Sequence, residues 1–193
     1  MYKYVIGIDE VGRGALAGLV TVTALVLQRK FKNKKLKTPL RDSKKLSARQ
    51  REIWFDFVKK QKIPYVVASI SPKVIDKINI SNAANLAASR ALLKLIKIHK
   101  LKNKSFTVRL DGGLYIRDLQ LKTKTVIKGD EKIPAISLAS IVAKVSRDRY
   151  MKKLHKKYPR YDFIHNVGYG TKKHIKAIKK YGFSPIHRRS FRI

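Results

Sequence analysis

The chain has 193 residues, 44% of them hydrophobic, which is enough for one folded domain with a real core and argues against disorder. It carries 46 Lys and Arg against 12 Asp and Glu, a formal net charge of +34, and it has no cysteine. The lack of cysteine excludes disulfides, thiolate metal sites and a cysteine nucleophile. The charge favours attraction to nucleic acid, ahead of an anionic membrane surface or a lysine-rich composition that only keeps the protein soluble.

The apolar stretches are too short to span a bilayer, and the first residues lack the basic and apolar regions of a signal peptide. The absence of cysteine also fits a reducing compartment. We therefore expect a soluble, cytoplasmic protein that does not contact a membrane.

The first half of the chain mixes predicted strands and helices. Runs of β-branched residues predict strands over residues 4–9, 20–27 and 65–70. Ser47 is a candidate N-cap for a helix that reaches about residue 60. Residues 82–99 are rich in Ala and Leu at helical spacing and predict a second helix.

The second half ends in helices. Strands are expected near residues 105–111 and 123–128. A long helix is expected over residues 137–156, and another over 171–181 that Gly182 ends. This order of elements predicts an α/β domain with a mixed sheet and a helical C-terminal part.

A soft boundary falls at Tyr158 and Pro159. We expect residues 1–157 to form the main domain and residues 158–193 a C-terminal helical extension. The pattern shows no internal repeat and no low-complexity linker.

Four acidic residues follow strand-like runs in a chain that otherwise has little acid: Asp9, Glu10, Asp111 and Asp130. Adjacent residues within a strand point to opposite faces of the sheet. Asp9 and Glu10 can therefore share one site only where their strand ends, and the glycines at 12 and 14 predict that it ends there. Carboxylates that meet at strand ends repel one another, which raises their pKa values, and divalent cations relieve the repulsion. One such aspartate is usually a solvated turn residue, whereas four in so basic a chain favour a metal site.

A site with two hard divalent ions suits in-line displacement at a phosphodiester, because one ion activates water and the other stabilises the leaving oxygen. Mg²⁺ prefers carboxylates, waters and substrate phosphate oxygens to a closed protein cage. With five histidines and no cysteine in the chain, zinc is not expected.

The loop Gly12-Arg13-Gly14 directly follows the first acidic pair. Its glycines allow close approach of the backbone to a ligand, and the Arg13 side chain could fork onto a phosphate. The alternative is a simple tight turn with an exposed arginine. The loop matches neither the phosphate-binding GxxxxGK[ST] pattern nor the dinucleotide-binding fingerprint.

Ordered blocks along nearly the whole chain resemble the type 2 ribonuclease H family, ribonuclease HII. The blocks are GIDEVGRG at 7–14, DSKKLS at 42–47, LDG at 110–112, KGD at 128–130, SLASIVAKVSRD at 137–148, NVGYGT at 166–171 followed by His174, and HRRSF at 187–191.

The resemblance implies a ribonuclease-H-like fold, a mixed five-stranded sheet flanked by helices, with a helical C-terminal extension. It implies an endonuclease that hydrolyses the RNA strand of RNA–DNA hybrids and nicks duplex DNA 5′ of embedded ribonucleotides, leaving 3′-hydroxyl and 5′-phosphate ends. Its metal ligands, for two Mg²⁺ or Mn²⁺ ions, map onto Asp9, Glu10, Asp111 and Asp130. Its ribose-sensing loop maps onto Gly12, Arg13 and Gly14, and its junction-sensing tyrosine onto Tyr169, whose ring we expect to be poorly shielded between two glycines.

Further residues are candidates for the substrate groove. Lys44 and Lys45 are expected near phosphates, and the equally common alternative for each is a solvated surface side chain. Ser140 and Lys144 lie one helical turn apart and face one way. Asp148 competes with Asp130 as fourth ligand, but its helical setting between two arginines favours an ion pair.

The histidines at 165, 174 and 187 are expected to be neutral and structural rather than phosphate ligands or proton carriers. The chain departs from the family pattern at Ala15, Leu19 and Val167, where proline, proline and lysine are usual. We expect a monomer, and no sliding-clamp motif is evident at the C-terminal end.

Two other functions remain open on the sequence alone. A non-catalytic RNA- or DNA-binding protein would account for the charge but not for four carboxylates, which repel phosphate unless metal is bound. A resolvase- or transposase-like enzyme of the same nuclease fold would use similar carboxylates on a branched substrate.

Overall fold

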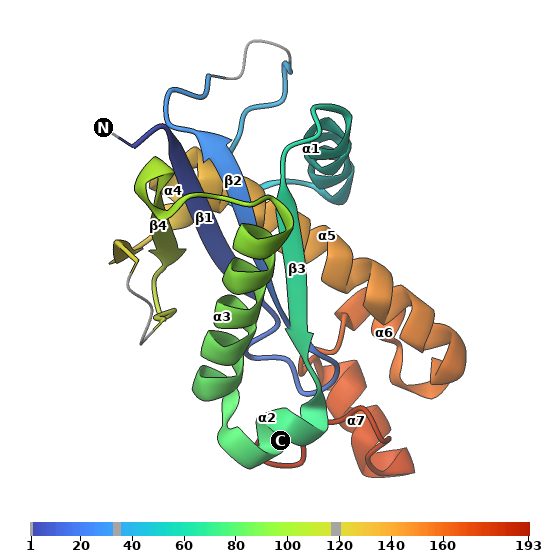
Figure 1. Ribbon diagram of the computed structural model, residues 1–193. Coiled ribbons are helices and arrows are strands. Elements are labelled where there is room, and N and C mark those ends of the chain that lie inside the picture. The colour runs from blue at the N-terminus through green and yellow to red at the C-terminus, as the bar shows by residue number, and fades with distance from the viewer. Residues whose placement is uncertain (1, 33–35, 117–120) are drawn as a thin grey trace.

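A computed structural model describes residues 2–32, 36–116 and 121–193 and shows a mixed five-stranded sheet with helices on both faces (Figure 1). The order of strands across the sheet is β3-β2-β1-β4-β5. Strand β1 pairs antiparallel with β2 and parallel with β4, β2 pairs antiparallel with β3, and β4 pairs parallel with β5. The strands are β1 (Tyr4–Val11), β2 (Val20–Gln28), β3 (Tyr65–Ile70), β4 (Phe106–Asp111) and β5 (Thr123–Val126).

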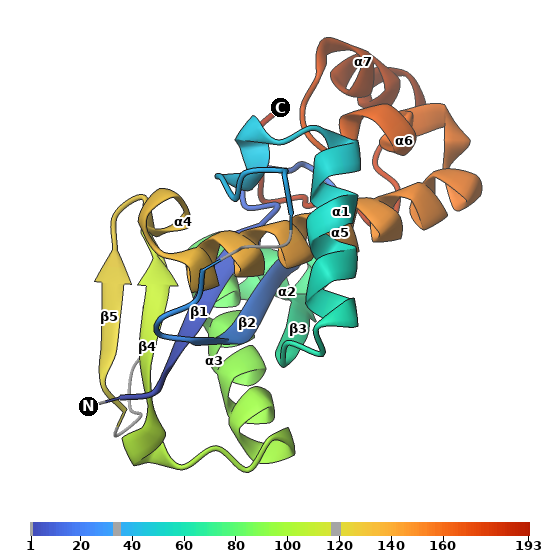
Figure 2. The ribbon, with the colours of Figure 1, turned by 90° about the horizontal axis from the view of Figure 1, so that it is seen from above.

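Helices cover both faces of the sheet, as the view from above shows most clearly (Figure 2). Helices α2 (Pro72–Ile78) and α3 (Ile80–Ile98) lie on one face, and α1 (Ala48–Lys60) and α5 (Pro134–Lys157) on the other. The shorter helical elements are α4 (Gly129–Lys132), α6 (Phe163–Asn166), α7 (Lys172–Tyr181), η1 (Ser43–Lys45), η2 (Asn103–Ser105) and η3 (Pro159–Tyr161). The predicted fold class, an α/β domain with a mixed five-stranded sheet, is confirmed.

Most predicted elements appear close to their expected bounds. Ser47 caps α1 as expected, and its hydroxyl accepts from the amide of Gln50 while the Gln50 side chain accepts from the Ser47 amide. Helix α5 begins earlier than residue 137, because Pro134 suits the first helical position, where no N–H is needed. Helix α2 was not expected from the sequence, and β5 ends before Lys128.

The apolar core consists of two layers separated by the sheet. One cluster fills the space between the sheet and α3, and the other lies between the sheet, α5 and α1 around the buried Trp54. Gly7 lets α5 lie directly on β1, since a Cβ at this position would meet the backbone carbon of Ala135 at 2.2 Å. This close approach brings α5 alongside the end of β1.

The C-terminal segment packs against the far end of α5 and the loop after β1 (Figure 1). Its apolar cluster joins Leu16 and Ala17 of that loop to Met151 of α5 and to Phe163 and Ile178. Within the described residues, no helix combines the length and apolar character needed to cross a bilayer.

Candidate active site

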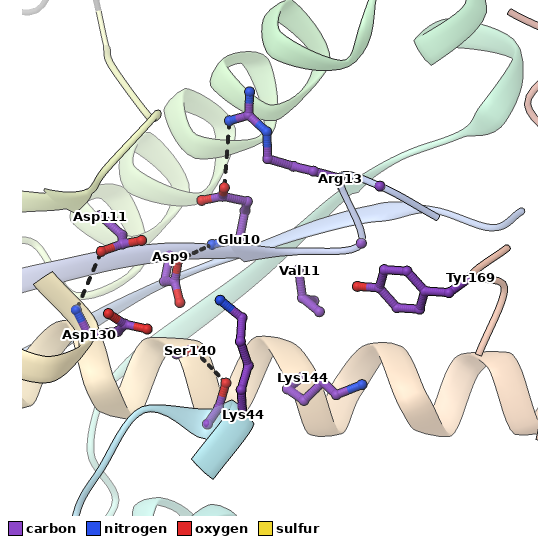
Figure 3. A pocket seen from close by; sticks show the side chains of 13 residues that line it. Asp9, Glu10, Val11, Arg13, Lys44, Asp111, Asp130, Ser140, Lys144 and Tyr169 are labelled. Atoms are coloured by element: carbon purple, nitrogen blue, oxygen red, sulfur yellow. Dashed lines mark hydrogen bonds and ion pairs between the residues drawn. The ribbon is translucent and has the colours of Figure 1, made fainter. Parts of the chain in front are cut away.

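The predicted site residues meet in one pocket of about 480 Å³ at the end of β1 (Figure 3). Every residue predicted for the site lines this pocket except Lys45, and Val11 and Ser43 line it as well. The walls come from β1, the loop after it, β4, α4, η1, α5 and the residue Tyr169. Segments far apart in the sequence therefore converge here.

Asp9 and Glu10 lie within β1 rather than at its end, which corrects the expectation that the strand stops there. Antiparallel pairing with β2 continues to Val11, whereas parallel pairing with β4 ends at the pair Ile8 and Leu110. Asp9 is therefore paired on one side only, and the pocket wraps around the unpaired edge of the strand. This arrangement allows side chains from both faces of β1 to line one pocket.

Asp111 is the last residue of β4 and would continue the parallel register beside Asp9. Its Oδ1 accepts from the amides of Gly129 and Asp130, at 2.7 and 3.3 Å. Asp130 was expected at a strand exit but lies in the first turn of α4 and is buried. Lys128, in the left-handed region at φ 53°, turns the chain into this short helix.

Burial, with repulsion between neighbouring carboxylates, raises the pKa values of Asp9, Glu10 and Asp130. Burial is the largest cause for Asp9, whose pKa lies well above its usual value, and the charges of Glu10 and Asp111 add to it, while a hydrogen bond from Ser140 opposes it. Burial also raises the pKa of Glu10 against the attraction of Arg13, and burial followed by repulsion from Asp111 raises that of Asp130. The site thus stores electrostatic repulsion that a cation would remove.

The donor set fits a hard cation, although the ligands are not drawn together. Among the described residues, no three Asp, Glu or His side chains are close enough to form a ready cage for an ion. The Glu10 Oε2 atom is buried without a hydrogen-bond partner. An unpartnered, buried carboxylate oxygen that lines the pocket has the chemistry of a ligand position.

Helix α5 and the segment before α1 form a second wall of the pocket. The hydroxyls of Ser140 and Ser43 lie 2.8 Å apart and join the two segments. Lys144 lines the pocket and forms a 2.8 Å ion pair with Asp148 on the next turn. Asp148 is thus occupied by an ion pair as expected, with Lys144 as its partner rather than a flanking arginine.

The two adjacent lysines of η1 have different positions. Lys44 is exposed and lines the pocket. Lys45 lies outside the pocket and pairs with Glu131 of α4 at 2.6 Å, so the structure does not bring it to the site.

The Arg13 side chain is engaged within the protein. Its guanidinium donates to the carbonyl of Gly113 at 3.1 Å and to the Ser81 hydroxyl at 3.0 Å, and it lies 3.5 Å from Glu10. The expected fork onto a phosphate is therefore not the arrangement found. Arg13 instead ties the loop after β1 to α3 and to the loop after β4.

Tyr169 comes from the C-terminal segment and points its hydroxyl toward the pocket beside Val11 (Figure 3). Its ring is only half-exposed, because the Arg147 guanidinium lies 5.5 Å from the ring centroid. The expectation of a poorly shielded ring is corrected by this contact. An isolated bridge between Ala15 and Tyr169 fixes the tyrosine beside the Gly-Arg-Gly loop.

Sequence reasoning missed three residues that shape the site. Asp42 lies close enough to Asp130 to raise its pKa, and an acid before Ser-Lys-Lys in so basic a chain was an available signal. Arg147 donates to the carbonyls of Ala17, Leu19 and Val167, and Arg188 to those of Arg13 and Gly18. Both arginines are almost fully buried, which no local pattern in a chain with 46 basic residues reveals.

Comparison with known proteins gives consistent results across sequence and structure. The family model for ribonuclease HII matches residues 6–193. A ribonuclease HII of Caldicellulosiruptor bescii is 45% identical over 190 residues, which cover 98% of this chain and 87% of the relative. Relatives of this name are nucleases that hydrolyse RNA in RNA–DNA hybrids.

Solved structures show the same fold. Ribonuclease H2 of Pyrococcus horikoshii superposes with a TM-score of 0.75 at 27% identity and covers 97% of this chain and 93% of its own. Bst-RNase HIII in complex with Mn²⁺ superposes with a TM-score of 0.74 at 18% identity and covers 93% of this chain and 63% of its own. With a family model that spans almost every residue and relatives this similar, the chain belongs to the ribonuclease HII family and is a ribonuclease H, a hydrolase of RNA–DNA hybrids.

Proposed function

We propose that the pocket hydrolyses the RNA strand of hybrids and also nicks duplex DNA on the 5′ side of an embedded ribonucleotide, leaving 3′-hydroxyl and 5′-phosphate ends. We further propose that Asp9, Glu10, Asp111 and Asp130 hold two divalent ions, Mg²⁺ or Mn²⁺. The observation that carries the proposal is the meeting of these four carboxylates in one pocket beside the Gly-Arg-Gly loop.

The chemistry of the donors supports the choice of ion. All four are carboxylates, and the described pocket lining contains no histidine or sulfur ligand, which suits hard cations. Bst-RNase HIII, which shares the fold, was solved with Mn²⁺. When bound, such ions supply an activated water and stabilise the leaving oxygen.

The chain's own residues give the reaction its geometry. Asp9 is buried and feels the charges of both Glu10 and Asp111, so it would hold a cation together with them. Asp111 holds Asp130 through the amides at the start of α4. Lys44 is exposed in the same pocket and presents positive charge to the substrate backbone, whereas Lys144 lines the pocket while paired with Asp148.

Recognition of the ribonucleotide falls to the loop after β1. No backbone-to-backbone hydrogen bond in the described chain uses the amide of Arg13 or Gly14, so both amides can donate to a ligand. A Cβ at Gly14 would meet nothing within 4 Å, which leaves open space over the loop. A 2′-hydroxyl both donates and accepts, and backbone groups can read it without interference from side chains.

Tyr169 would contact the sugar next to the scissile bond. Its ring reaches the pocket from the C-terminal segment, with Arg147 behind it. A deoxyribose can stack on the ring, whereas a 2′-hydroxyl would crowd it. In this arrangement residues 158–193 form a helical extension that completes the substrate groove.

The direct test is cleavage of a DNA duplex that contains one ribonucleotide, with the cut position and the end groups mapped, in EDTA and in Mg²⁺ or Mn²⁺. We expect a single cut 5′ of the ribonucleotide that needs the ion. Asp111→Asn should lose this cleavage, and Asp56→Asn, which removes an exposed charge on α1, serves as the matched control. Cleavage in EDTA, or an Asp111→Asn variant that keeps wild-type activity, would show that the assignment of the site is wrong.

The role of Tyr169 needs its own test. Tyr169→Ala should reduce cleavage at the single ribonucleotide more than it reduces cleavage of a continuous RNA–DNA hybrid, because only the former has a deoxyribose at the reacting junction. Tyr181→Ala, on the exposed side of α7, is the control for loss of a surface tyrosine. Equal effects on both substrates would remove Tyr169 from junction recognition.

A further inference from the structure

Two histidines of the C-terminal segment are buried against each other behind Tyr169. His174 lies in α7 and His187 follows that helix, and their exposed fractions are 0% and 2%. Their Nε2 atoms lie 3.0 Å apart. The rings of Tyr161 and Phe163 surround the pair, so no solvent separates the two imidazoles.

The hydrogen bonds around this pair admit one arrangement of protons. The Ser184 amide lies 2.9 Å from His187 Nδ1, and because an amide only donates, this nitrogen must accept. The Ser184 hydroxyl faces the same atom at 2.8 Å. The proton of neutral His187 is therefore on Nε2, and it is donated to His174 Nε2.

The same logic fixes His174. Its Nε2 accepts from His187, so its own proton is on Nδ1, which donates to the carbonyl of Tyr169 at 2.8 Å. A proton added to either ring would leave two N–H groups facing each other. Burial agrees with this picture, since it lowers the pKa of His174 and, with repulsion from His174, lowers the pKa of His187 to about 4.

The chain of hydrogen bonds ends on a segment that needs support. Gly168 and Gly170 flank Tyr169, and Gly168 has φ 88°, so the local backbone alone leaves the tyrosine considerable freedom. The Gly168 carbonyl accepts from the amides of Leu16 and Ala17, which ties the same segment to the loop after β1. A rotation of the peptide after Tyr169 would break the bond from His174 and turn the ring relative to that loop.

We propose that His174 and His187 are positioning residues. The series of hydrogen bonds that runs from Ser184 through both imidazoles to the Tyr169 carbonyl sets the angle at which the tyrosine ring meets the sugar. This angle in turn sets the preference for a single embedded ribonucleotide. The inference rests on the proposed role of Tyr169. Neither histidine lines the pocket and both are buried, so they would act through Tyr169 rather than on the substrate itself.

A matched pair of variants separates positioning from packing. In His174→Asn the amide nitrogen takes the place of Nδ1 and can still donate to Tyr169, whereas His174→Leu keeps the bulk and loses the donor. We measure kcat/KM on a duplex with one ribonucleotide and on a continuous hybrid. His174→Leu should lower the ratio of the first to the second by about tenfold, within the roughly hundredfold loss that a misplacement of about 1 Å can cause, and His174→Asn should restore most of it.

A second measurement does not depend on activity or on the variants folding. Heteronuclear NMR of the imidazole nitrogens in the wild-type protein should show a proton on Nδ1 of His174 and on Nε2 of His187 at neutral pH. The opposite tautomers, or a charged ring, would overturn the inference, as would a folded His174→Leu variant with the wild-type ratio. If Tyr169→Ala changes the ratio and His174→Leu does not, only this inference fails; if Tyr169→Ala leaves it unchanged, the proposed function of the tyrosine fails first.

Discussion

Asp9→Asn is expected to stabilise the ion-free protein and to abolish turnover. Asp9 is buried, and burial, followed by the charges of Glu10 and Asp111, raises its pKa well above 3.8. A carboxyl whose pKa is higher in the folded state binds its proton more tightly there, so stability falls as pH rises from the unfolded pKa to the folded pKa. At a pH above the folded pKa the full cost is present, and asparagine, which carries no charge, removes it.

The size of the effect follows from the linkage between pKa and stability. Each unit by which folding raises the pKa of Asp9 costs about 1.4 kcal/mol at a pH above the folded pKa, and in a domain of this size that is about 3–6 °C in Tm. Ions act in the opposite direction on the wild type. An ion at a hundredfold excess over its Kd stabilises the folded state by about 2.7 kcal/mol, and Asp9→Asn should lose most of this gain.

Thermal unfolding in EDTA and in Mn²⁺, at acidic and at neutral pH, measures both effects: the stabilisation by Asp9→Asn without ions and its smaller gain in stability from ions. The variant should unfold at a higher temperature than the wild type in EDTA, by a margin that shrinks on acidification, and should respond less to Mn²⁺. Its affinity for a duplex should be equal or higher, since a negative charge near phosphate is gone. Asp56→Asn, in an exposed position, should change neither response. A variant that gains as much stability from Mn²⁺ as the wild type, or that keeps near-normal activity, would refute the reasoning.

Three further changes test how the fold holds the site. Gly7→Ala places a Cβ 2.2 Å from the backbone of Ala135 and should cost about 3 kcal/mol or prevent folding, as chemical denaturation will show; a loss under about 1 kcal/mol would mean that α5 can shift freely. Arg147→Met leaves the carbonyls of three loop residues without a donor and should lower the free energy of unfolding by about 3 kcal/mol or more. Urea titration measures this loss, with Arg149→Met at an exposed position as the control. Val167 has φ 43°, a strained angle for a β-branched residue, so Val167→Asn should raise stability by about 1 kcal/mol; a lower Tm would show that the packing of valine outweighs the strain.

Local patterns in the sequence were sufficient for most of the secondary structure, and they supplied candidate site residues of which all but Lys45 line one pocket. The predicted strands became β1 to β5, and Ser47 caps α1 as its position before the helical stripe indicates. The acidic residues were recognisable because 12 acids in a chain with 46 basic residues are conspicuous. Ordered blocks along the chain pointed to the family that the comparisons then showed.

The tertiary structure alone decided how these residues meet. The sequence could not tell that β1 pairs with β2 beyond the point where it leaves β4, because strand pairing depends on segments about a hundred residues apart. It could not tell which lysine of η1 faces the pocket, or that Arg13 is held by Ser81 and Gly113. Long side chains reach partners that no spacing rule connects, so the contacts of a basic residue become known only when the neighbouring segments are in place.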